Sequence, residues 1–380
     1  MLTVYFKPTN FCHVGCEHCY LSEEVRANKD RMSLDKAKQV AEFLAQASEK
    51  FKDPNVYIIW HGGEPLVLPP DYFYQVGEIF DEFLPGHEEG IQTSLIPYSE
   101  KYRQVVIDRF KGGIGTSMDF AARKIKGSAE AYQDKWMKKV RLARSHGFPL
   151  GLLITPARSD LGLADQRIDW LVNNEFDYFN FERYNSFGQT LPDKPSNREH
   201  AQFLIEALNK IIQEIENKGI APMVPVLVAG IGGVLNGQPG DRWGGSCQHD
   251  FFVIEPDGSL NNCPDKASFE PAYSNINDGL GAFVNSPLRK KWIRIQNYGH
   301  RIDECATCEN NTWCRSGCPI TPNADPHSDE TECSGYKSFI NHIRQLIKDP
   351  VKKEILEKYR AGVYTPTWSP NGLSSPKMPT

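Results

Sequence analysis

The chain has 380 residues, of which 40% are hydrophobic, 24% charged and 11% aromatic. This composition is typical of a folded globular protein and excludes a mainly disordered chain. The formal net charge of -5 is not the positive charge that is typical of nucleic-acid-binding proteins. No apolar run approaches the ~18–20 residues of a membrane span, and the opening MLTVYFKPTN lacks the features of a signal peptide. We therefore expect a cytoplasmic protein of two or three structural units that binds neither nucleic acid nor a membrane.

Short β-rich runs alternate with amphipathic stretches through the first half of the chain. Strands are expected at 2–7, 56–60, 90–95, 113–119, 150–155 and 177–184. Helices are expected from an N-cap at Ser33, around Trp136, and over 198–218 with Gly219 as the stop. Such alternation predicts an α/β fold in which six strand–helix units form an open, barrel-like parallel sheet. Its chemistry is expected at the carboxyl ends of the strands.

The character of the sequence changes after residue 219. Glycine and proline become frequent in the stretch AGIGGVLNGQPGDRWGG, and most of the cysteines follow it. We expect metal, more than a large apolar core, to hold the cysteine-rich part together. The predicted organisation is a barrel over 1–219, a bridging region over 220–246, a cysteine-rich domain over 247–345, and a C-terminal helix with a Pro/Ser-rich, weakly ordered tail over 346–380.

The ten cysteines fall into two groups. Cys12, Cys16 and Cys19 crowd the N-terminus, and the remaining seven are Cys247, Cys263, Cys305, Cys308, Cys314, Cys318 and Cys333. Ten cysteines are too few for a disulfide scaffold of this length. Tight groups of cysteines in an intracellular chain indicate bound metal.

Three thiols lie within the segment CHVGCEHCY (12–20), directly after the first expected strand. A fully held 4Fe-4S cube takes four protein ligands, so three cysteines leave one iron open to a small molecule. A zinc knuckle that uses His13 or His18 is the alternative interpretation.

The spacing C-x-x-x-C-x-x-C after a first strand resembles that of the radical S-adenosylmethionine (radical SAM) family. The resemblance implies a partial (β/α)6 TIM-like barrel and a 4Fe-4S cluster whose open iron chelates SAM. It also implies reductive cleavage of SAM to a 5′-deoxyadenosyl radical that abstracts hydrogen from a substrate, with an electron donor such as flavodoxin or ferredoxin. The family usually has an aromatic residue before the third cysteine, where this chain has His18, with Tyr20 just after.

Gly62, Gly63, Glu64 and Pro65 follow the second expected strand and resemble the family's GGEP element. Glycines let the backbone approach a ligand closely, and a carboxylate can accept hydrogen bonds from an ammonium group. The implied role of this element is to hold the amine of SAM.

Two further elements of the family have weaker counterparts. Gln92, Thr93 and Ser94 resemble the QTN element after the third strand, with Ser94 in place of asparagine. Ser117 and Asp119 resemble the S-x-D element after the fourth strand, where the serine usually meets the SAM ribose. A serine or aspartate at the end of a strand is about as often a helix cap.

The second cysteine group, over roughly 247–336, closely resembles the SPASM domain, a C-terminal extension of radical SAM enzymes that act mainly on peptides and proteins. The resemblance implies two auxiliary 4Fe-4S clusters, hence three clusters in all. By analogy, one auxiliary cluster is closed by Cys305, Cys308, Cys314 and Cys333.

The other auxiliary cluster is expected to use Cys247, Cys263 and Cys318. Seven thiolates cannot complete two cubes, which need eight, so its fourth position is either open to substrate or taken by Asp241, His249 or Asp250. Structural zinc is the alternative for this region, although it leaves the N-terminal trio unexplained.

The segment 180–185 is the most polar of the expected strands. Because alternate residues of a barrel strand face inward, either Glu182 and Tyr184 or Arg183 and Asn185 are expected to point into the lumen. Contact with SAM or peptide is one interpretation, and a structural Glu–Arg pair is the other. Arg158, after the fifth strand, is a weaker candidate.

The resemblance favours an oxidoreductase that matures a ribosomally made precursor peptide by forming an oxidative cross-link, either a cyclophane or a thioether. Asp119, Glu182 and Asp265 are its candidate catalytic groups. Only eleven residues precede Cys12, so recognition of a leader is expected from the barrel mouth, the 219–246 region or a separate leader-binding protein.

Three other functions are open. An anaerobic sulfatase-maturating (formylglycine-generating) enzyme would have an additional cysteine before the position of Cys247. It would also have an aspartate directly after the position of Cys263, whereas here Pro264 separates Cys263 from Asp265. A small-molecule dehydrogenase of the same superfamily is less favoured, because the C-terminal part of such enzymes resembles a shortened version of this seven-cysteine pattern. A non-catalytic iron–sulfur or zinc protein leaves the GGEP-like loop without a purpose.

Overall fold

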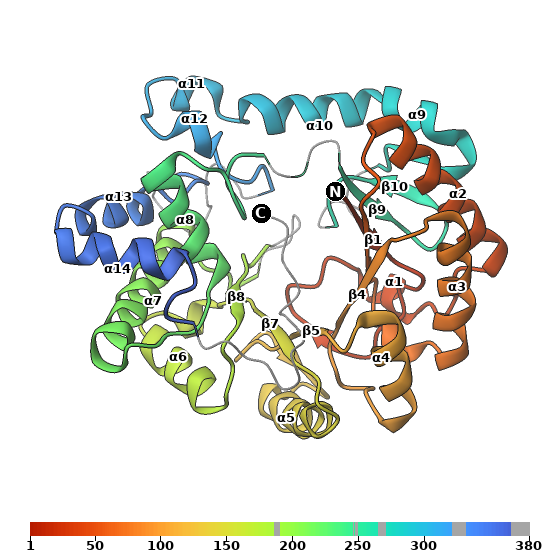
Figure 1. Ribbon diagram of the computed structural model, residues 1–380, viewed down its shortest axis with the longest axis horizontal. Coiled ribbons are helices and arrows are strands. Elements are labelled where there is room, and N and C mark those ends of the chain that lie inside the picture. Colours follow the sequence, from red (N-terminus) through yellow and green to blue (C-terminus); the bar gives the residue numbers. More distant parts are fainter. Residues whose placement is uncertain (186–190, 246, 248–249, 265–270, 321–331, 366–380) are drawn as a thin grey trace.

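One sheet curves around the centre of the protein, with helices outside it (Figure 1). The computed structural model describes residues 1–185, 191–245, 247, 250–264, 271–320 and 332–365. The strands are β1 (Leu2–Phe6), β3 (Val56–Trp60), β4 (Glu88–Thr93), β5 (Ile114–Ser117), β7 (Leu150–Ile154), β8 (Phe179–Phe181), β9 (Phe251–Ile254), β10 (Ser259–Asn261) and β11 (Ser274–Asn275). Their order in the sheet is β11-β10-β9-β1-β3-β4-β5-β7-β8, and a separate ribbon pairs β2 (Gly15–Cys16) with β6 (Arg123–Lys124).

The α/β class and the six-strand parallel sheet are confirmed. Neighbouring strands from β1 to β8 pair in parallel, as strand–helix alternation requires. The predicted bounds are close for all strands except the last, since β8 ends at Phe181 rather than at residue 184. There the Arg242 guanidinium donates to the Phe181 carbonyl at 2.6 Å, so a side chain takes the place of a neighbouring strand.

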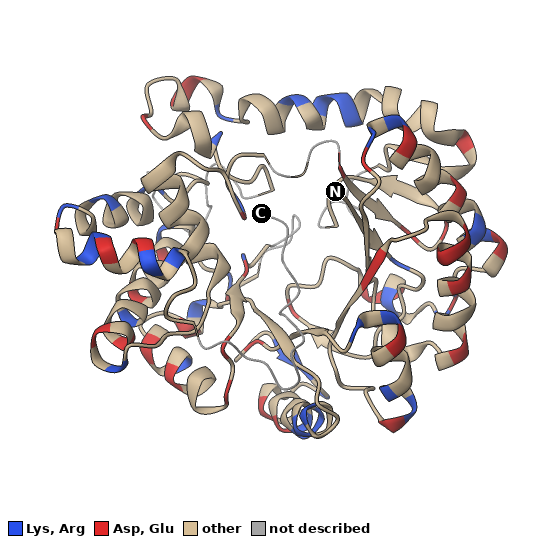
Figure 2. Ribbon diagram, viewed as in Figure 1, with Lys and Arg blue, Asp and Glu red and all other residues tan. Residues whose placement is uncertain are grey.

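Helices cover the outside of this sheet (Figure 1). They are α1 (Glu23–Ala27), α2 (Leu34–Phe51), α3 (Pro70–Phe83), α4 (Arg103–Phe110), α5 (Ala129–Ser145), α6 (Ala164–Asn173), α7 (Asn197–Lys218), α8 (Pro225–Asn236), α9 (Gly279–Asn285), α10 (Pro287–Tyr298), α11 (Ile302–Cys305), α12 (Asn311–Cys314), α13 (Lys337–Leu346) and α14 (Pro350–Arg360). The predicted caps are confirmed: Ser33 Oγ accepts from Lys36 N at 3.2 Å, and Gly219 ends α7 with φ of 69°. Figure 2 shows charged residues mainly on these helices, whereas the strands are largely uncharged.

The cysteine-rich part of the chain is built into the same sheet. Strand β9 pairs in parallel with β1, with Thr3 opposite Phe251 and Phe6 opposite Ile254. Strand β10 then pairs antiparallel with β9, and β11 with β10. Strand β1 is therefore an interior strand with a partner on either side.

The part of the chain after residue 219 has a large apolar core, which the sequence analysis did not expect, and the contribution expected from metal stays a prediction. Buried apolar residues of this part, including Trp243, Trp313 and Phe339, belong to one core that also contains the barrel residues. The glycines of α8 make this possible, because a side chain on Gly233 would collide with the Trp313 ring and one on Gly230 with Phe339. The glycine-rich stretch as far as Asn236 thus belongs to helix α8, in which the missing side chains leave room for aromatic rings.

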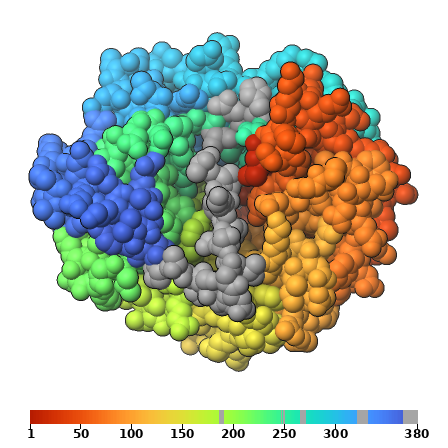
Figure 3. Space-filling model, in the orientation of Figure 1, coloured from red at the N-terminus to blue at the C-terminus, as the bar shows by residue number. Residues whose placement is uncertain are grey.

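The same view as a surface places the N-terminal residues, in red and orange, opposite the blue C-terminal helices α13 and α14 (Figure 3). Among the helices in the described ranges, none has the length and apolar character that crossing a bilayer requires. Most of the expected Pro/Ser-rich tail falls outside the described residues.

Gly77 gives a direct test of packing between α3 and α4. A side chain at this position would meet the guanidinium of Arg109, which forms ion pairs with Asp81 and Glu89. We expect Gly77→Ala to lower the free energy of unfolding by about 1–3 kcal/mol, as overpacking does, in a denaturant titration. Gly281→Ala is the matched control, since Gly281 also lies in a helix but its added methyl meets no atom. A Gly77→Ala protein as stable as that control would contradict this packing.

Candidate active site

The predicted cofactor residues converge on one edge of the sheet. The cysteine loop follows β1, Gly62 and Gly63 follow β3, and Thr93 ends β4. Ser117 ends the neighbouring β5. Because these strands are parallel, all these positions lie at the carboxyl edge, where active sites of α/β barrels are built.

The cysteine loop is held by the backbone around α1. The amide of Cys12 donates to the Arg26 carbonyl at 3.1 Å, and the Arg26 guanidinium donates to the Val14 carbonyl at 2.9 Å. Burial raises the pKa of Cys12 to about 12 and that of Cys16 to about 11. Buried thiols of this kind lose their protons when a positively charged metal centre compensates. The donor set of Cys12, Cys16 and Cys19 therefore fits an iron–sulfur cluster.

The two glycines after β3 bring the backbone of their loop against the cysteine loop. Gly62 has φ of 114°, and side chains on Gly62 and Gly63 would collide with the carbonyls of Thr9 and Asn10. The Gly63 amide donates to the Thr9 carbonyl at 3.0 Å, and Tyr20 Oη donates to the Gly62 carbonyl at 2.7 Å. The glycines thus allow the two loops to pack closely. The sequence analysis had instead assigned these glycines to the close approach of a ligand.

The Glu64 carboxylate has a structural role that the sequence analysis did not predict. It is completely buried, and its oxygens accept hydrogen bonds from Leu66 N at 3.0 Å, Thr93 Oγ1 at 2.6 Å and Ser94 N at 2.8 Å, and also from Ser94 Oγ. With its acceptor positions already used, this carboxylate anchors the loop after β4. The predicted contact of this loop with the amine of SAM stays a prediction.

The remaining predicted cofactor positions are also tied together. Pro65 begins a 3-10 turn over Pro65–Val67. Gln92 Nε2 donates to Ser117 Oγ at 2.8 Å, and Tyr132 Oη donates to the Ser117 carbonyl at 2.8 Å. Ser117 thus lies at the carboxyl edge beside the β4 loop, as its predicted contact with the SAM ribose requires.

Asp119 lies between the cysteine loop and strand β7. Its Oδ1 accepts from Thr155 N at 2.6 Å, and its Oδ2 lies 2.7 Å from Arg123 Nε and 3.4 Å from His18 Nε2. Burial lowers the pKa of His18 to about 4, so the imidazole is neutral at pH 7. The Asp119 carboxylate thus contacts an amide, a guanidinium and an imidazole, and these contacts favour a positioning role.

Arg123 is the residue at this site that the sequence interpretation missed. It is absent from every motif used above, and only the pairing of β2 with β6 brings it beside Cys16. Arg158, in contrast, lies outside the site, since its Nη2 is 3.1 Å from Glu199 Oε2 at the start of α7.

Glu182 belongs to a buried polar network at the end of β8. Asn180 Nδ2 donates to Glu182 Oε1 at 2.9 Å and to Asp241 Oδ2 at 3.0 Å. Arg242 donates from Nε to Asp241 Oδ1 at 3.0 Å and contacts His200 Nε2 at 3.0 Å with Nη1. Both Asp241 oxygens are therefore engaged, which argues against this residue as a cluster ligand.

The pKa values of the two carboxyl groups of this network are shifted in opposite directions. Burial and then the neighbouring Asp241 raise the pKa of Glu182, with Arg242 and Arg183 opposing the shift. Burial acts on Asp241 as well, but Arg242 more than offsets it, so the pKa of Asp241 is lowered. Of the two groups, Glu182 is thus the one whose pKa is raised by its surroundings.

The network continues toward the second cysteine group. The His200 ring stacks on Tyr336 with centroids 5.2 Å apart, and the Arg242 guanidinium lies 5.5 Å from the centre of the Tyr336 ring. Cys318 lies close enough to Tyr336 to raise its pKa, although burial is the main cause of that shift. A continuous set of contacts therefore connects the end of β8 with the cysteine-rich region.

Four of the C-terminal thiols, which the family resemblance assigns to one auxiliary cluster, lie in one neighbourhood, and their ligand role stays a prediction. Burial raises the pKa of Cys314 to about 12, and Cys333, Cys305 and Cys308 add to the shift because their thiols lie nearby. Gly335 lets them approach, since a Cβ there would lie 2.6 Å from Cys314 Sγ. All ten cysteines are free of disulfides. These four fit a second metal centre.

The set of Cys247, Cys263 and Cys318 stays a prediction. Cys263 is buried, and Trp292 Nε1 of α10 donates to the Cys247 carbonyl at 2.8 Å. Asp250 is exposed and pairs with β1 through its backbone. The candidate ligand His249 and the candidate base Asp265 lie outside the described residues.

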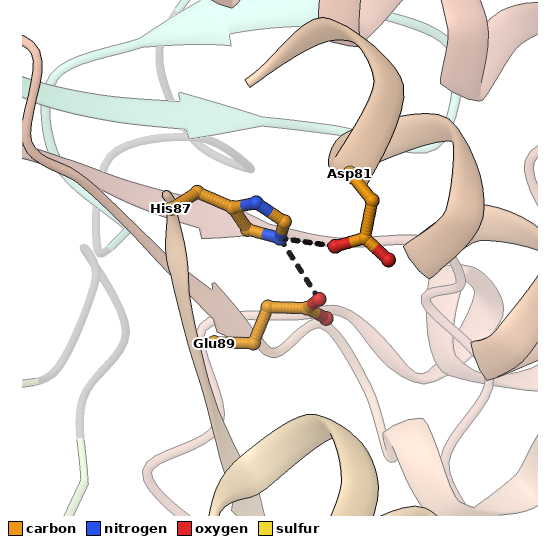
Figure 4. A group of neighbouring side chains, drawn as sticks. All are labelled: Asp81, His87 and Glu89. Carbon is orange, nitrogen blue, oxygen red and sulfur yellow. Dashed lines mark hydrogen bonds and ion pairs between the residues drawn. The ribbon is translucent and has the colours of Figure 1, made fainter. Parts of the chain in front are cut away.

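A separate group of possible ligands lies at the opposite, amino end of β4, where Asp81, His87 and Glu89 face one another (Figure 4). His87 Nε2 is 3.0 Å from Glu89 Oε1. Arg109 already contacts both carboxylates, with Nη1 2.7 Å from Asp81 Oδ2. The guanidinium supplies the positive charge that a metal ion would bring, so we interpret this group as an ion-pair cluster.

Comparison with known proteins identifies the domain. Residues 6–158 match the family model described as the Radical SAM superfamily. The chain carries a radical SAM domain. This domain implies a 4Fe-4S cluster and SAM, and the buried donor set of Cys12, Cys16 and Cys19 fits the cluster.

Similar proteins cover most of the chain. A serine-type anaerobic sulfatase-maturating enzyme of Klebsiella aerogenes is 21% identical over 370 residues, which are 92% of this chain and 87% of that protein. The structure of anSMEcpe with bound AdoMet superposes with a TM-score of 0.77 at 15% identity, covering 94% of this chain and 100% of that one. Streptococcus suis SuiB bound to its precursor peptide SuiA gives 0.61 at 14% identity, covering 84% and 72%. The radical SAM fold is therefore shared along nearly the whole chain.

The role of Glu64 can be tested by Glu64→Gln. An amide in place of the carboxylate turns one acceptor into a donor that faces other donors, so we expect a loss of about 1–3 kcal/mol in unfolding free energy and weaker SAM binding in equilibrium dialysis. Iron bound per chain should stay unchanged, because the hydrogen bonds of the Glu64 carboxylate go to Leu66, Thr93 and Ser94 and not to a cysteine. Glu206→Gln, on the outer side of α7, is the control. Unchanged stability and SAM affinity would contradict the anchoring role.

Proposed function

We propose that this radical SAM protein oxidises a side chain of a ribosomally made precursor peptide and forms a cross-link, with two auxiliary 4Fe-4S clusters besides the one that binds SAM. The observation that carries the proposal is the second set of gathered thiols, Cys305, Cys308, Cys314 and Cys333. Its domain shares the barrel sheet through β9 and contacts the barrel mouth through Tyr336.

The proposed reaction removes two hydrogen atoms from the peptide in total. When bound, SAM and its cluster supply a radical that takes one hydrogen atom from a side-chain carbon. Bond formation then releases one proton and one electron. Glu182 is the proposed proton acceptor, because burial and Asp241 bring its pKa closer to neutrality. The auxiliary thiols would hold the centre that accepts the electron, and an electron-transfer protein such as flavodoxin or ferredoxin would supply the electron that starts each cycle.

The second candidate function is formylglycine formation in a sulfatase. It is supported by the Klebsiella aerogenes relative, whose name assigns that activity, and by the complete coverage of anSMEcpe in the structural comparison. Two sequence features count against it: the stretch before Cys247 has no additional cysteine, and Pro264 separates Cys263 from Asp265.

The number of clusters is tested by metal analysis after anaerobic reconstitution. Three cubes predict about twelve irons per chain with matching sulfide. Gly335→Ala should reduce this to about eight, because its methyl group would occupy the space of Cys314 Sγ. Gly281→Ala, which meets no atom, should keep the full content. Zinc without labile sulfide would exclude the auxiliary clusters.

The reaction is tested by mass spectrometry of a candidate peptide co-expressed with the protein. A cross-link lowers the peptide mass by two hydrogens, about 2 Da, and gives no aldehyde. Oxidation of serine to formylglycine causes the same mass loss, but the product reacts with a hydrazide probe. An aldehyde in the product would therefore contradict cross-link formation and support formylglycine formation. An unmodified mass would contradict both functions.

Glu182→Gln tests the proposed proton acceptor. The amide keeps the shape of the side chain but cannot take up a proton, so we expect iron content to be retained while peptide turnover falls by about 10²-fold or more. Asn180→Ala should cause a smaller loss, because Asn180 orients the carboxylate without exchanging protons. Full turnover by Glu182→Gln would remove Glu182 from the reaction.

A further inference from the structure

A short β-ribbon fastens the cysteine loop to the segment after β5. Cys16 of β2 lies opposite Arg123 of β6, and Gly15 lies opposite Lys124. The ribbon is extended by a hydrogen bond from Glu17 N to the Ala122 carbonyl at 2.9 Å. This pairing fixes the backbone of Arg123 beside a predicted iron ligand.

The Arg123 side chain turns toward that ligand. Its Nη1 donates to Cys16 Sγ at 3.4 Å, and its side chain is only 17% exposed. Its Nε lies 2.7 Å from Asp119 Oδ2, and Asp119 is in turn held by Thr155 N of β7. The guanidinium is therefore fixed between one sulfur and one carboxylate, largely out of solvent.

A donor in this position acts on the electron affinity of the cluster. Hydrogen bonds to the sulfurs, net charge and solvent exposure set the reduction potentials of iron–sulfur clusters. Reduction adds a negative charge to the cluster, and a guanidinium at the Cys16 sulfur stabilises that charge, more so at a site with little solvent. Asp119 neutralises part of the guanidinium charge and keeps its orientation.

We propose that Arg123 is a positioning residue that raises the reduction potential of the cluster held by Cys12, Cys16 and Cys19, and that Asp119 fixes its guanidinium for this purpose. The inference requires the cluster of the radical SAM domain, but it is independent of the proposed peptide substrate.

The test compares midpoint potentials of the full chain, reconstituted anaerobically, by redox titration with EPR detection. The N-terminal cluster is recognised by the change that added SAM causes in its reduced signal, and potentials are then measured without SAM. Arg123→Met removes the charge and the donor while keeping much of the side-chain volume. We expect it to make reduction about tenfold less favourable, a fall of about 59 mV for one electron. Arg123→Lys should stay closer to the original value.

Lys124→Met is the matched control. Lys124 lies on the same ribbon strand, but its ammonium group is paired with the Glu17 carboxylate and not with a cysteine. Its variant should keep both iron content and potential. An unchanged potential in Arg123→Met with full iron would overturn the inference. Equal iron loss in the Met and Lys variants would also overturn it, because Arg123 would then serve only to fold the ribbon.

Discussion

The active-site edge of this protein depends on the burial of one carboxylate. Glu64 lies in the loop after β3, and its carboxylate accepts hydrogen bonds from Thr93 and Ser94 at the end of β4. The two glycines before Glu64 let the loop after β3 pack against the backbone carbonyls that precede Cys12. Three neighbouring loops are thereby joined, and buried polar groups satisfied in this way define a single arrangement. The metal-binding loop consequently rests on a rigid support although it has little regular structure of its own.

Much of the fold and of the metal chemistry is readable in the sequence. The six barrel strands follow from apolar runs and turn residues, and the spacing of Cys12, Cys16 and Cys19 predicts an open metal centre. These signals are local, so a single sequence is sufficient to find them. The grouping of Cys314 with Cys305, Cys308 and Cys333 came from family resemblance and agrees with their proximity.

The missed features are all contacts between distant segments. Arg123 lies 107 positions from Cys16, and no periodicity connects the two. The helix α8 was missed because its glycines are typical of loops, and the aromatic rings that they admit, such as Trp313, come from elsewhere in the chain. The hydrogen bonds of Glu64 were missed for the same reason, since its partners Thr93 and Ser94 lie 29 and 30 positions away.

The parallel pairing of β1 with β9 has a consequence for how the chain is made. Residues 2–6 leave the ribosome long before one of their two neighbours, which lies about 250 positions later. Until that segment arrives, β1 presents an unpaired edge of backbone donors and acceptors, which invites association with other chains. Contacts at such separation form slowly. Assembly of the barrel and acquisition of its metal are therefore expected to finish only after synthesis of the cysteine-rich part, so the two halves mature as one cooperative unit.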